Sequence, residues 1–255
     1  MAERNETRAV REQESEWIVG RNAVSEALKA NRPLDRVLIA RGERNGRLGY
    51  LAALCRDAGV PVKEVDSRKL DELCGPHHQG IAAAAACREY ATVEDLFRLA
   101  EERGEAPLFI VCDELEDPHN LGAILRTAEA AGAHGVILPK RRSVGLTPAV
   151  YKASAGAVEH VPVARVTNIT ETLRELKERG VWIYGLDMDG SAWDKTDLKG
   201  AVALVVGSEG RGISRLVRET CDFVVSLPMF GKVNSLNASV ACSIVLYEAV
   251  RQRHG

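Results

Sequence analysis

Residues 227–248 read LPMFGKVNSLNASVACSIVLYE, and from Ser235 to Tyr247 this stretch contains no charged residue. Alanine, serine and cysteine mix with valine, isoleucine and leucine, so a helix formed here has no charged face. Such a helix is buried on most sides. At about thirteen residues it is too short to span a bilayer. We therefore expect protein to cover it, either the rest of this chain or a second copy.

The start of this helix is polar. Gly231, Asn234, Ser235 and Asn237 place flexible and hydrogen-bonding residues where the unpaired N–H groups of a first helical turn face outward. The polar end of a buried helix can hold a ligand, so this loop is a candidate binding site.

The composition is that of an ordinary globular protein. Of the 255 residues, 45% are hydrophobic and 27% are charged, enough for one large domain or two modest ones. No run approaches eighteen apolar residues, and the charged N-terminus lacks the apolar core of a signal peptide, so we expect a cytoplasmic protein with no membrane partner. The six cysteines occur singly, without a Cys-x-x-Cys pair or a histidine at ligand spacing. They are interpreted as reduced core residues, and no metal site is expected.

The order of apolar and polar stretches predicts an α/β protein with two domains. Residues 1–16 lack periodicity and are predicted to be a disordered tail. Residues 17–88 alternate short strands and helices in a small α/β domain, and residues 89–106 form an acidic linker. Residues 107–255 contain near-continuous apolar strands separated by helices, which predicts a parallel sheet covered on both faces. These strands are expected at Leu108–Cys112, Gly135–Leu138, Val161–Val166, Val181–Leu186, Val202–Val206 and Phe223–Leu227.

Positive charge is concentrated in residues 17–88, which contain 12 lysines and arginines against 8 aspartates and glutamates. Part of this positive charge lies in a glycine-containing loop with Arg41, Arg44 and Arg47, whose planar guanidinium groups could bind phosphates. The alternative is a solvated loop between a strand and a helix, and the sequence leaves both open.

Two further short segments are predicted to be turns rather than metal sites. His77, His78 and Gln79 lie between glycine and proline, and adjacent histidines do not have a chelating spacing, which favours a solvated turn. Asp187-Met-Asp189-Gly190 lacks the later ligands of a calcium loop.

Ligands of parallel sheets bind beyond the carboxyl ends of the strands, so the loops that follow strands are the places to search for chemistry. After the strand at 108–112, a helix is expected with an apolar stripe through Leu121, Ile124 and Leu125. Arg126 lies about 140° from Leu121 around this helix and faces away from its core. Asn120 is well placed as the N-cap of the helix, and a solvated arginine is the alternative for Arg126.

A second loop, Val206-Gly-Ser-Glu209-Gly-Arg-Gly-Ile-Ser214, contains three glycines that let the backbone approach a bound group. Its glycine spacing is not that of a dinucleotide fingerprint, and the lysine of a P-loop is absent. The carboxylate of Glu209 would repel a pyrophosphate. A ligand with a cationic centre, or with sugar hydroxyls to donate, is the better partner.

These loops together resemble a known family. Three segments are similar, in this order, to the three motifs of the SpoU (TrmH) ribose 2′-O-methyltransferases of the SPOUT superfamily. They are Asn120-x-Gly-x-x-x-Arg126, then Gly207-Ser-Glu209-Gly210, then Leu227-Pro-Met-x-Gly231 with Ser235-Leu236-Asn237-x-Ser239. The resemblance runs from about Trp17 to Arg253. Residues 161–168 resemble the bacterial branch that methylates a guanosine of 23S ribosomal RNA.

The resemblance implies a catalytic domain whose C-terminal segment forms a trefoil knot and binds S-adenosylmethionine. In the family the cofactor lies against three loops, which correspond here to Gly207, Leu227 and Leu236. The first domain resembles the family's RNA-binding domain, which is similar to a ribosomal protein, and would carry Arg41, Arg44 and Arg47 to the RNA. Family members are homodimers joined through the knot region, which would cover the uncharged helix.

The resemblance also implies the catalytic residues. Arg126 would lie closest to the attacking 2′-hydroxyl, while Asn120, Glu209, Ser235 and Asn237 would orient it together with the ribose and the cofactor. A guanidinium is hardly ever deprotonated in a protein, so we expect Arg126 to bind the phosphate and the developing alkoxide and leave the proton acceptor open.

Two other classes of function remain as alternatives. A nicotinamide-dependent oxidoreductase would need a glycine fingerprint after the first strand of the second domain, where this chain has Asp113-Glu-Leu-Glu-Asp-Pro118 instead. A non-catalytic RNA-binding factor would have no reason to retain Arg126, Glu209 and Asn237 together. Within the family, a transfer RNA guanosine is the next possible substrate.

Overall fold

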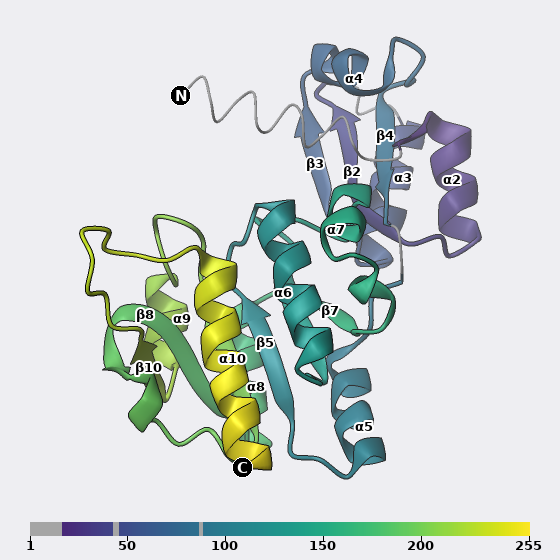
Figure 1. Cartoon of the computed structure of the whole chain (residues 1–255). Coiled ribbons are helices and arrows are strands. Elements are labelled where there is room, and N and C mark those ends of the chain that lie inside the picture. Colours follow the sequence, from purple (N-terminus) through teal and green to yellow (C-terminus); the bar gives the residue numbers. More distant parts are fainter. Residues whose placement is uncertain (1–16, 43–45, 87–88) are drawn as a thin grey trace. The chain divides into compact units, whose positions relative to one another are not determined.

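The structure, a computed structural model, describes residues 17–42, 46–86 and 89–255 (Figure 1). The predicted tail and Arg44 lie outside these residues. The chain divides into two compact units, a first unit of Met1–Glu89 with Gly145–Ala149 and a second unit of Tyr90–Val144 with Val150–Gly255.

The first unit is a four-stranded sheet with helices on both faces. Its strand order is β1-β4-β2-β3, in which β2 and β3 are parallel and the other pairs antiparallel. Alternate residues of β2 face opposite sides: Val37 packs with α2 and α3, and Leu38 packs with α4. The elements are β1 (Trp17–Val19), α2 (Arg21–Lys29), β2 (Leu34–Ala40), α3 (Gly46–Asp57), β3 (Val62–Val65), α4 (Ser67–Cys74) and β4 (Ile81–Ala85).

The second unit contains a six-stranded sheet in which every pair is parallel, in the order β10-β8-β9-β5-β6-β7. The predicted α/β class and parallel sheet are thus confirmed. The strands are β5 (Leu108–Cys112), β6 (Gly135–Pro139), β7 (Val163–Val166), β8 (Trp182–Ala192), β9 (Val202–Val206) and β10 (Phe223–Ser226). The helices are α5 (Val93–Arg103), α6 (Pro118–Ala130), α7 (Pro148–Ala153), α8 (Ile169–Glu178), α9 (Arg215–Thr220) and α10 (Ala238–His254), with 3-10 turns at Ala157–Glu159 and Trp193–Lys195.

Helices cover both faces of this sheet. Phe109 and Val111 of β5 pack with α5, α8 and α9 on one face. On the other face α6 and α10 lie side by side across β5 (Figure 1) and are joined by a 2.9 Å hydrogen bond between the hydroxyls of Thr127 and Ser243. Strands covered in this way need apolar residues at consecutive positions, which is why they could be located from the sequence.

β8 runs past the predicted strand end at Leu186 and includes the segment Asp187–Gly190, which was predicted to be a turn. The prediction was wrong because β10 pairs with Tyr184 and Gly185 before this segment and, after a register shift, with Ser191 and Ala192 beyond it. Pairing between distant strands is not visible in local composition. Gly190 permits the pairing, since a Cβ there would lie 2.4 Å from the carbonyl oxygen of Val224.

The last helix, α10, is only partly covered within one chain. Ser239, Cys242 and Leu246 are buried, whereas Val240 is 46% exposed and Tyr247 is 49% exposed. The rest of the chain therefore covers one face of this helix, whose residues up to Tyr247 carry no charge, and leaves an apolar face open.

Candidate functional site

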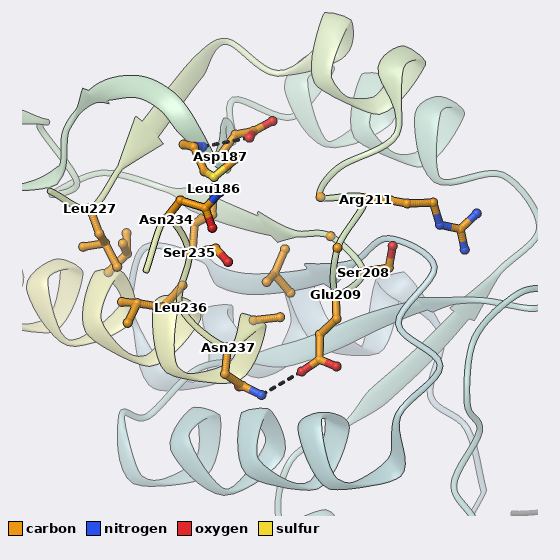
Figure 2. A pocket seen from close by; sticks show the side chains of 18 of the residues that line it. Leu186, Asp187, Ser208, Glu209, Arg211, Leu227, Asn234, Ser235, Leu236 and Asn237 are labelled. Carbon is orange, nitrogen blue, oxygen red and sulfur yellow. Dashed lines mark hydrogen bonds between the residues drawn. The ribbon is translucent and has the colours of Figure 1, made fainter. Parts of the chain in front are cut away.

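A pocket of about 550 Å³ lies beyond the carboxyl ends of β9 and β10 and beside the middle of β8 (Figure 2). Its walls come from the glycine loop after β9, the middle of β8, and the loop from β10 into α10. Six of the predicted site residues line it: Gly207, Glu209, Leu227, Ser235, Leu236 and Asn237. The second and third motifs therefore meet there although they lie apart in the sequence.

Three side chains from three different motifs are joined by hydrogen bonds at this wall. Asn120 donates through Nδ2 to Oε1 of Glu209 at 2.8 Å. Asn237 donates through Nδ2 to the same oxygen at 2.8 Å, as Figure 2 shows. Asn237 Nδ2 also donates to Oδ1 of Asn120 at 2.8 Å. We refer to Asn120, Glu209 and Asn237 as the amide–carboxylate network.

Asn120 is not the N-cap of α6. That position belongs to Asp117, whose side chain accepts a hydrogen bond from the N–H of His119, and Pro118 occupies the first helical turn. Asn120 lies within the helix, is 3% exposed, and is therefore available for the bond to Glu209. The alternative interpretation of Asn120 as the N-cap was wrong because Asp117, three residues earlier, already satisfies the helix start.

Asn237 links this network to the start of α10. Its Oδ1 accepts from the N–H groups of Ser239 at 2.9 Å and Val240 at 3.3 Å, as an N-cap does. The same oxygen accepts from the hydroxyl of Ser239 at 2.6 Å. One amide thus closes the helix with its oxygen and holds Glu209 with its nitrogen.

The glycine loop is tightly folded. Ser208 and Gly212 exchange backbone hydrogen bonds of 3.1 and 2.9 Å, and Gly210 and Gly212 have positive φ angles of 79° and 65° that favour glycine. The N–H of Ser214 donates to the buried carboxylate of Asp113 at 2.7 Å. These bonds fix the backbone that forms one wall of the pocket.

The structure does not bring the other predicted residues into the network. Arg126 is exposed on α6 and, within the described part of the chain, forms no hydrogen bond or ion pair. Ser235 lines the pocket and likewise has no hydrogen-bond partner among the described residues. In the first unit, Arg47 donates to Oδ1 of Asn22 at 2.8 Å and Arg41 is exposed.

Among the pocket residues that were not predicted as site residues, Asp187 carries a charge. Asp187 lines the pocket from β8, and its carboxylate is held by the guanidinium of Arg218, which also binds Asp189 at 2.8 Å. The available signal was its position at the end of an apolar run, next to the strand that precedes the glycine loop.

The described residues near the pocket offer no thiolate. Burial raises the pKa of Cys242, on α10, to about 12, so this thiol stays protonated at neutral pH. Among residues 17–42, 46–86 and 89–255, no group of three histidines, cysteines or carboxylates is placed to hold a metal ion.

None of the helices described has both the length and the apolar character to cross a membrane.

Comparison with known proteins identifies relatives along almost the whole chain. The model of the SpoU rRNA Methylase family matches residues 107–247, and the model described as RNA 2′-O ribose methyltransferase substrate binding matches residues 17–91. YacO of Bacillus subtilis (strain 168), assigned to the TrmH family of tRNA/rRNA methyltransferases, is 49% identical over 244 residues. This match covers 95% of this chain and 98% of YacO.

Solved structures agree with these matches. The SpoU methyltransferase AviRb from Streptomyces viridochromogenes, in complex with AdoMet, has a TM-score of 0.59 at 28% identity, over 94% of this chain and 91% of AviRb. The TrmH/SpoU tRNA modifying enzyme of A. aeolicus has a TM-score of 0.53 at 32% identity, over 63% of this chain and 83% of that enzyme. The family resemblance predicted from the three motifs is confirmed, and the chain belongs to the SpoU/TrmH family of RNA 2′-O-methyltransferases.

Proposed function

We propose that this protein transfers a methyl group from S-adenosylmethionine to the ribose 2′-hydroxyl of a guanosine in 23S ribosomal RNA. The observation that carries the proposal is the amide–carboxylate network, because it joins one polar residue from each of the three family motifs at the wall of a single pocket. An RNA-binding factor without catalysis gives no reason for such a network.

The residues of the pocket fit this cofactor. Leu227, Leu236 and Val245 offer apolar surface for a flat base, and the loop from Gly207 to Gly212 offers backbone groups at close approach. A carboxylate at the wall, Glu209, suits a ligand with a cationic centre. When bound, S-adenosylmethionine supplies an activated methyl group on a sulfonium.

The protein must then position the ribose oxygen for in-line attack, which requires orientation rather than a covalent intermediate. The network holds Glu209 with two N–H donors on one oxygen and leaves its second oxygen to orient a ribose hydroxyl. Arg126, an exposed cation without a partner in the described chain, binds the phosphate next to the target and stabilises the developing alkoxide. Ser235 orients the cofactor from the opposite loop.

The remaining family features belong to the same proposal. The segment from the glycine loop to α10 forms a trefoil knot, and two copies pair through the open face of α10, burying Val240 and Tyr247. An exposed apolar face on a helix without charge favours such pairing. The protein acts in the cytoplasm, where its RNA is.

Ribosomal RNA is preferred over transfer RNA because of the first unit. The tRNA modifying enzyme of A. aeolicus matches only 63% of this chain, whereas here a separate segment, residues 17–91, matches the substrate-binding family model. A large folded RNA gives such an additional domain a surface to bind. A guanosine of transfer RNA is the second candidate, since YacO is assigned to a family that acts on both RNAs.

The test combines mapping with a matched pair of variants. Ribose methylation is mapped on ribosomal and transfer RNA from cells with and without the gene, and one 23S guanosine is expected to lose its methyl group.

In vitro, Arg126→Ala should lower turnover on saturating RNA by about 10²–10³-fold while leaving cofactor affinity unchanged. Arg174→Ala, which removes another exposed arginine of the second unit, should retain the normal rate. A normal rate for Arg126→Ala would remove this residue from the mechanism.

A further inference from the structure

Several chain segments of the first unit converge at one end of its sheet. The N–H of Gly20, after β1, donates to the carbonyl of Ile81 at 3.1 Å, and the N–H of Ala40, at the end of β2, donates to the carbonyl of Gly80 at 2.9 Å. The residues that follow β1 and β2 therefore lie beside the loop that precedes β4. We call the five side chains gathered here the donor surface: Arg21, Asn22, Arg41, Arg47 and Gln79.

Gln79 is fixed in this surface by its oxygen atoms. Its Oε1 accepts from the backbone N–H of Arg21 at 3.2 Å, and its carbonyl oxygen accepts from Nε of Arg21 at 2.9 Å. It thereby satisfies the start of α2, whose N-cap, Gly20, has no side chain to do so. The amide nitrogen of Gln79 remains exposed, with two N–H groups and no acceptor among the described residues.

A buried histidine holds Gln79 in place. The sequence predicted a solvated turn here, but His78 is 5% exposed; its Nδ1 accepts from the N–H of Gly80 at 2.9 Å and its Nε2 lies 3.2 Å from a carboxylate oxygen of Asp71. Neutral His78 thus carries its proton on Nε2 and donates to Asp71. These bonds flank Gln79, whose φ of 51° is uncommon for a residue other than glycine. The bonds of His78 thus hold Gln79 in an uncommon backbone conformation, in which its side chain lies at the surface.

Asn22 is fixed in the same way. Its Oδ1 accepts from the guanidinium of Arg47 at 2.8 Å, and within the described chain its amide nitrogen has no acceptor. Each amide oxygen therefore accepts one hydrogen bond from the protein, and each NH₂ group has no acceptor among the described residues. Together with the guanidinium groups, these NH₂ groups offer hydrogen-bond donors for recognition.

We propose that the donor surface binds the RNA substrate and reads acceptor atoms on it. This inference rests on the proposed function and extends it to Arg21, Asn22 and Gln79. The arginines bind phosphates. The NH₂ groups of Asn22 and Gln79 donate to acceptor atoms, such as O6 and N7 of an unstacked guanine.

The test measures binding of an unmodified 23S ribosomal RNA transcript to the full chain by filter binding over a range of KCl concentrations. Gln79→Glu and Asn22→Asp keep the oxygen that the protein uses and remove the NH₂ donors. Asn31→Asp is the matched control, since it makes the same chemical change at an exposed position just beyond the other end of α2. Each variant should weaken RNA binding about tenfold more than the control, while cofactor affinity and melting temperature stay unchanged. In addition, Arg41→Gln should reduce the slope of log K against log salt by about one.

The outcomes separate this inference from the proposed function. If Gln79→Glu and Asn22→Asp bind the transcript as Asn31→Asp does, the donor surface does not read RNA, even though the enzyme still methylates it. If the unaltered protein binds neither the 23S transcript nor transfer RNA, the proposed function itself fails. Should Gln79→Glu not fold, Asn22→Asp decides the question, because the side chain of Asn22 hydrogen-bonds, among the described residues, to the exposed side chain of Arg47 alone.

Discussion

Replacing Gly207 by alanine tests the tight glycine loop as a wall of the cofactor pocket. A Cβ at this position would lie 2.0 Å from the carbonyl carbon of Gly212, 2.1 Å from its oxygen and 2.3 Å from the nitrogen of Ile213. Cβ contacts under 3.0 Å do not occur in real structures, so backbone would have to move by about 1 Å. Gly207 does not have a positive φ, so the conflict is one of space alone.

The expected loss of cofactor affinity and stability follows from the parts of the chain that would have to move. Forcing one methyl group into a well-packed site costs about 1–3 kcal/mol. Here the clash is with backbone, which cannot rotate away, and the strand β9 before Gly207 is buried. The loop would shift as a unit, carrying Glu209 away from Asn120 and Asn237. We therefore expect cofactor affinity to fall at least tenfold, which corresponds to about 1.4 kcal/mol, and the melting temperature to fall by about 2–4 °C for each kcal/mol of stability lost.

The assay is calorimetric titration with S-adenosylmethionine, together with thermal unfolding. Gly200→Ala is the matched control, because a Cβ there meets no atom within 4 Å and its φ is not positive. This variant should bind the cofactor normally and be as stable as the unaltered protein or slightly more so. If Gly207→Ala bound the cofactor with normal affinity, the wall of the pocket would not be where this reasoning places it.

Two further predictions concern stability. Hydrogen bonds from Arg251 and Gln252 lower the pKa of Glu248 to about 2. The stability that Glu248 contributes is therefore complete above about pH 4.5 and is lost as the pH falls toward 2. Glu248→Gln should flatten the decline in the free energy of unfolding, measured by urea titration, over that pH range. Gly122→Ala would place a Cβ 2.4 Å from that of Ala153 and should lower the unfolding free energy by about 1–3 kcal/mol. Gly49→Ala, whose Cβ would lie in open space, should cause no loss in the same urea titration.

Much of the fold could be predicted from the sequence because its signals are local. The strands Leu108–Cys112 and Val202–Val206 have the predicted bounds, since strands buried on both faces need consecutive apolar residues. The ends of α5 are likewise marked by local signals. The hydroxyl of Thr92 and the carboxylate of Asp95 form a capping box at its start, and Gly104 adopts a left-handed conformation at its end.

The features that could not be predicted depend on partners far away in the chain. Asparagine is a residue type that favours helix N-caps, so a capping role for Asn120 could be read from the sequence. Only the position of Glu209, 89 residues later, gives Asn120 its other role as a donor to that carboxylate. His78 looked like part of a solvated turn, and its burial depends on Asp71 and the loop before β4. Polar residues are ambiguous in this way because a hydrogen bond can be satisfied locally or at long range, whereas an apolar run has few alternatives to burial.

Asn237 explains why the uncharged helix and the site belong to one structure. α10 packs closely against α6 because small residues such as Ser243 face Thr127 across the contact. This packing places the start of α10 beside Asn120, 117 residues earlier in the chain, within hydrogen-bond distance of Asn237. The oxygen of Asn237 is already occupied by the first turn of α10, so its nitrogen is oriented before any ligand binds. Folding of the last helix and assembly of the network are therefore the same event, and a charged residue in the face toward α6 would destroy both.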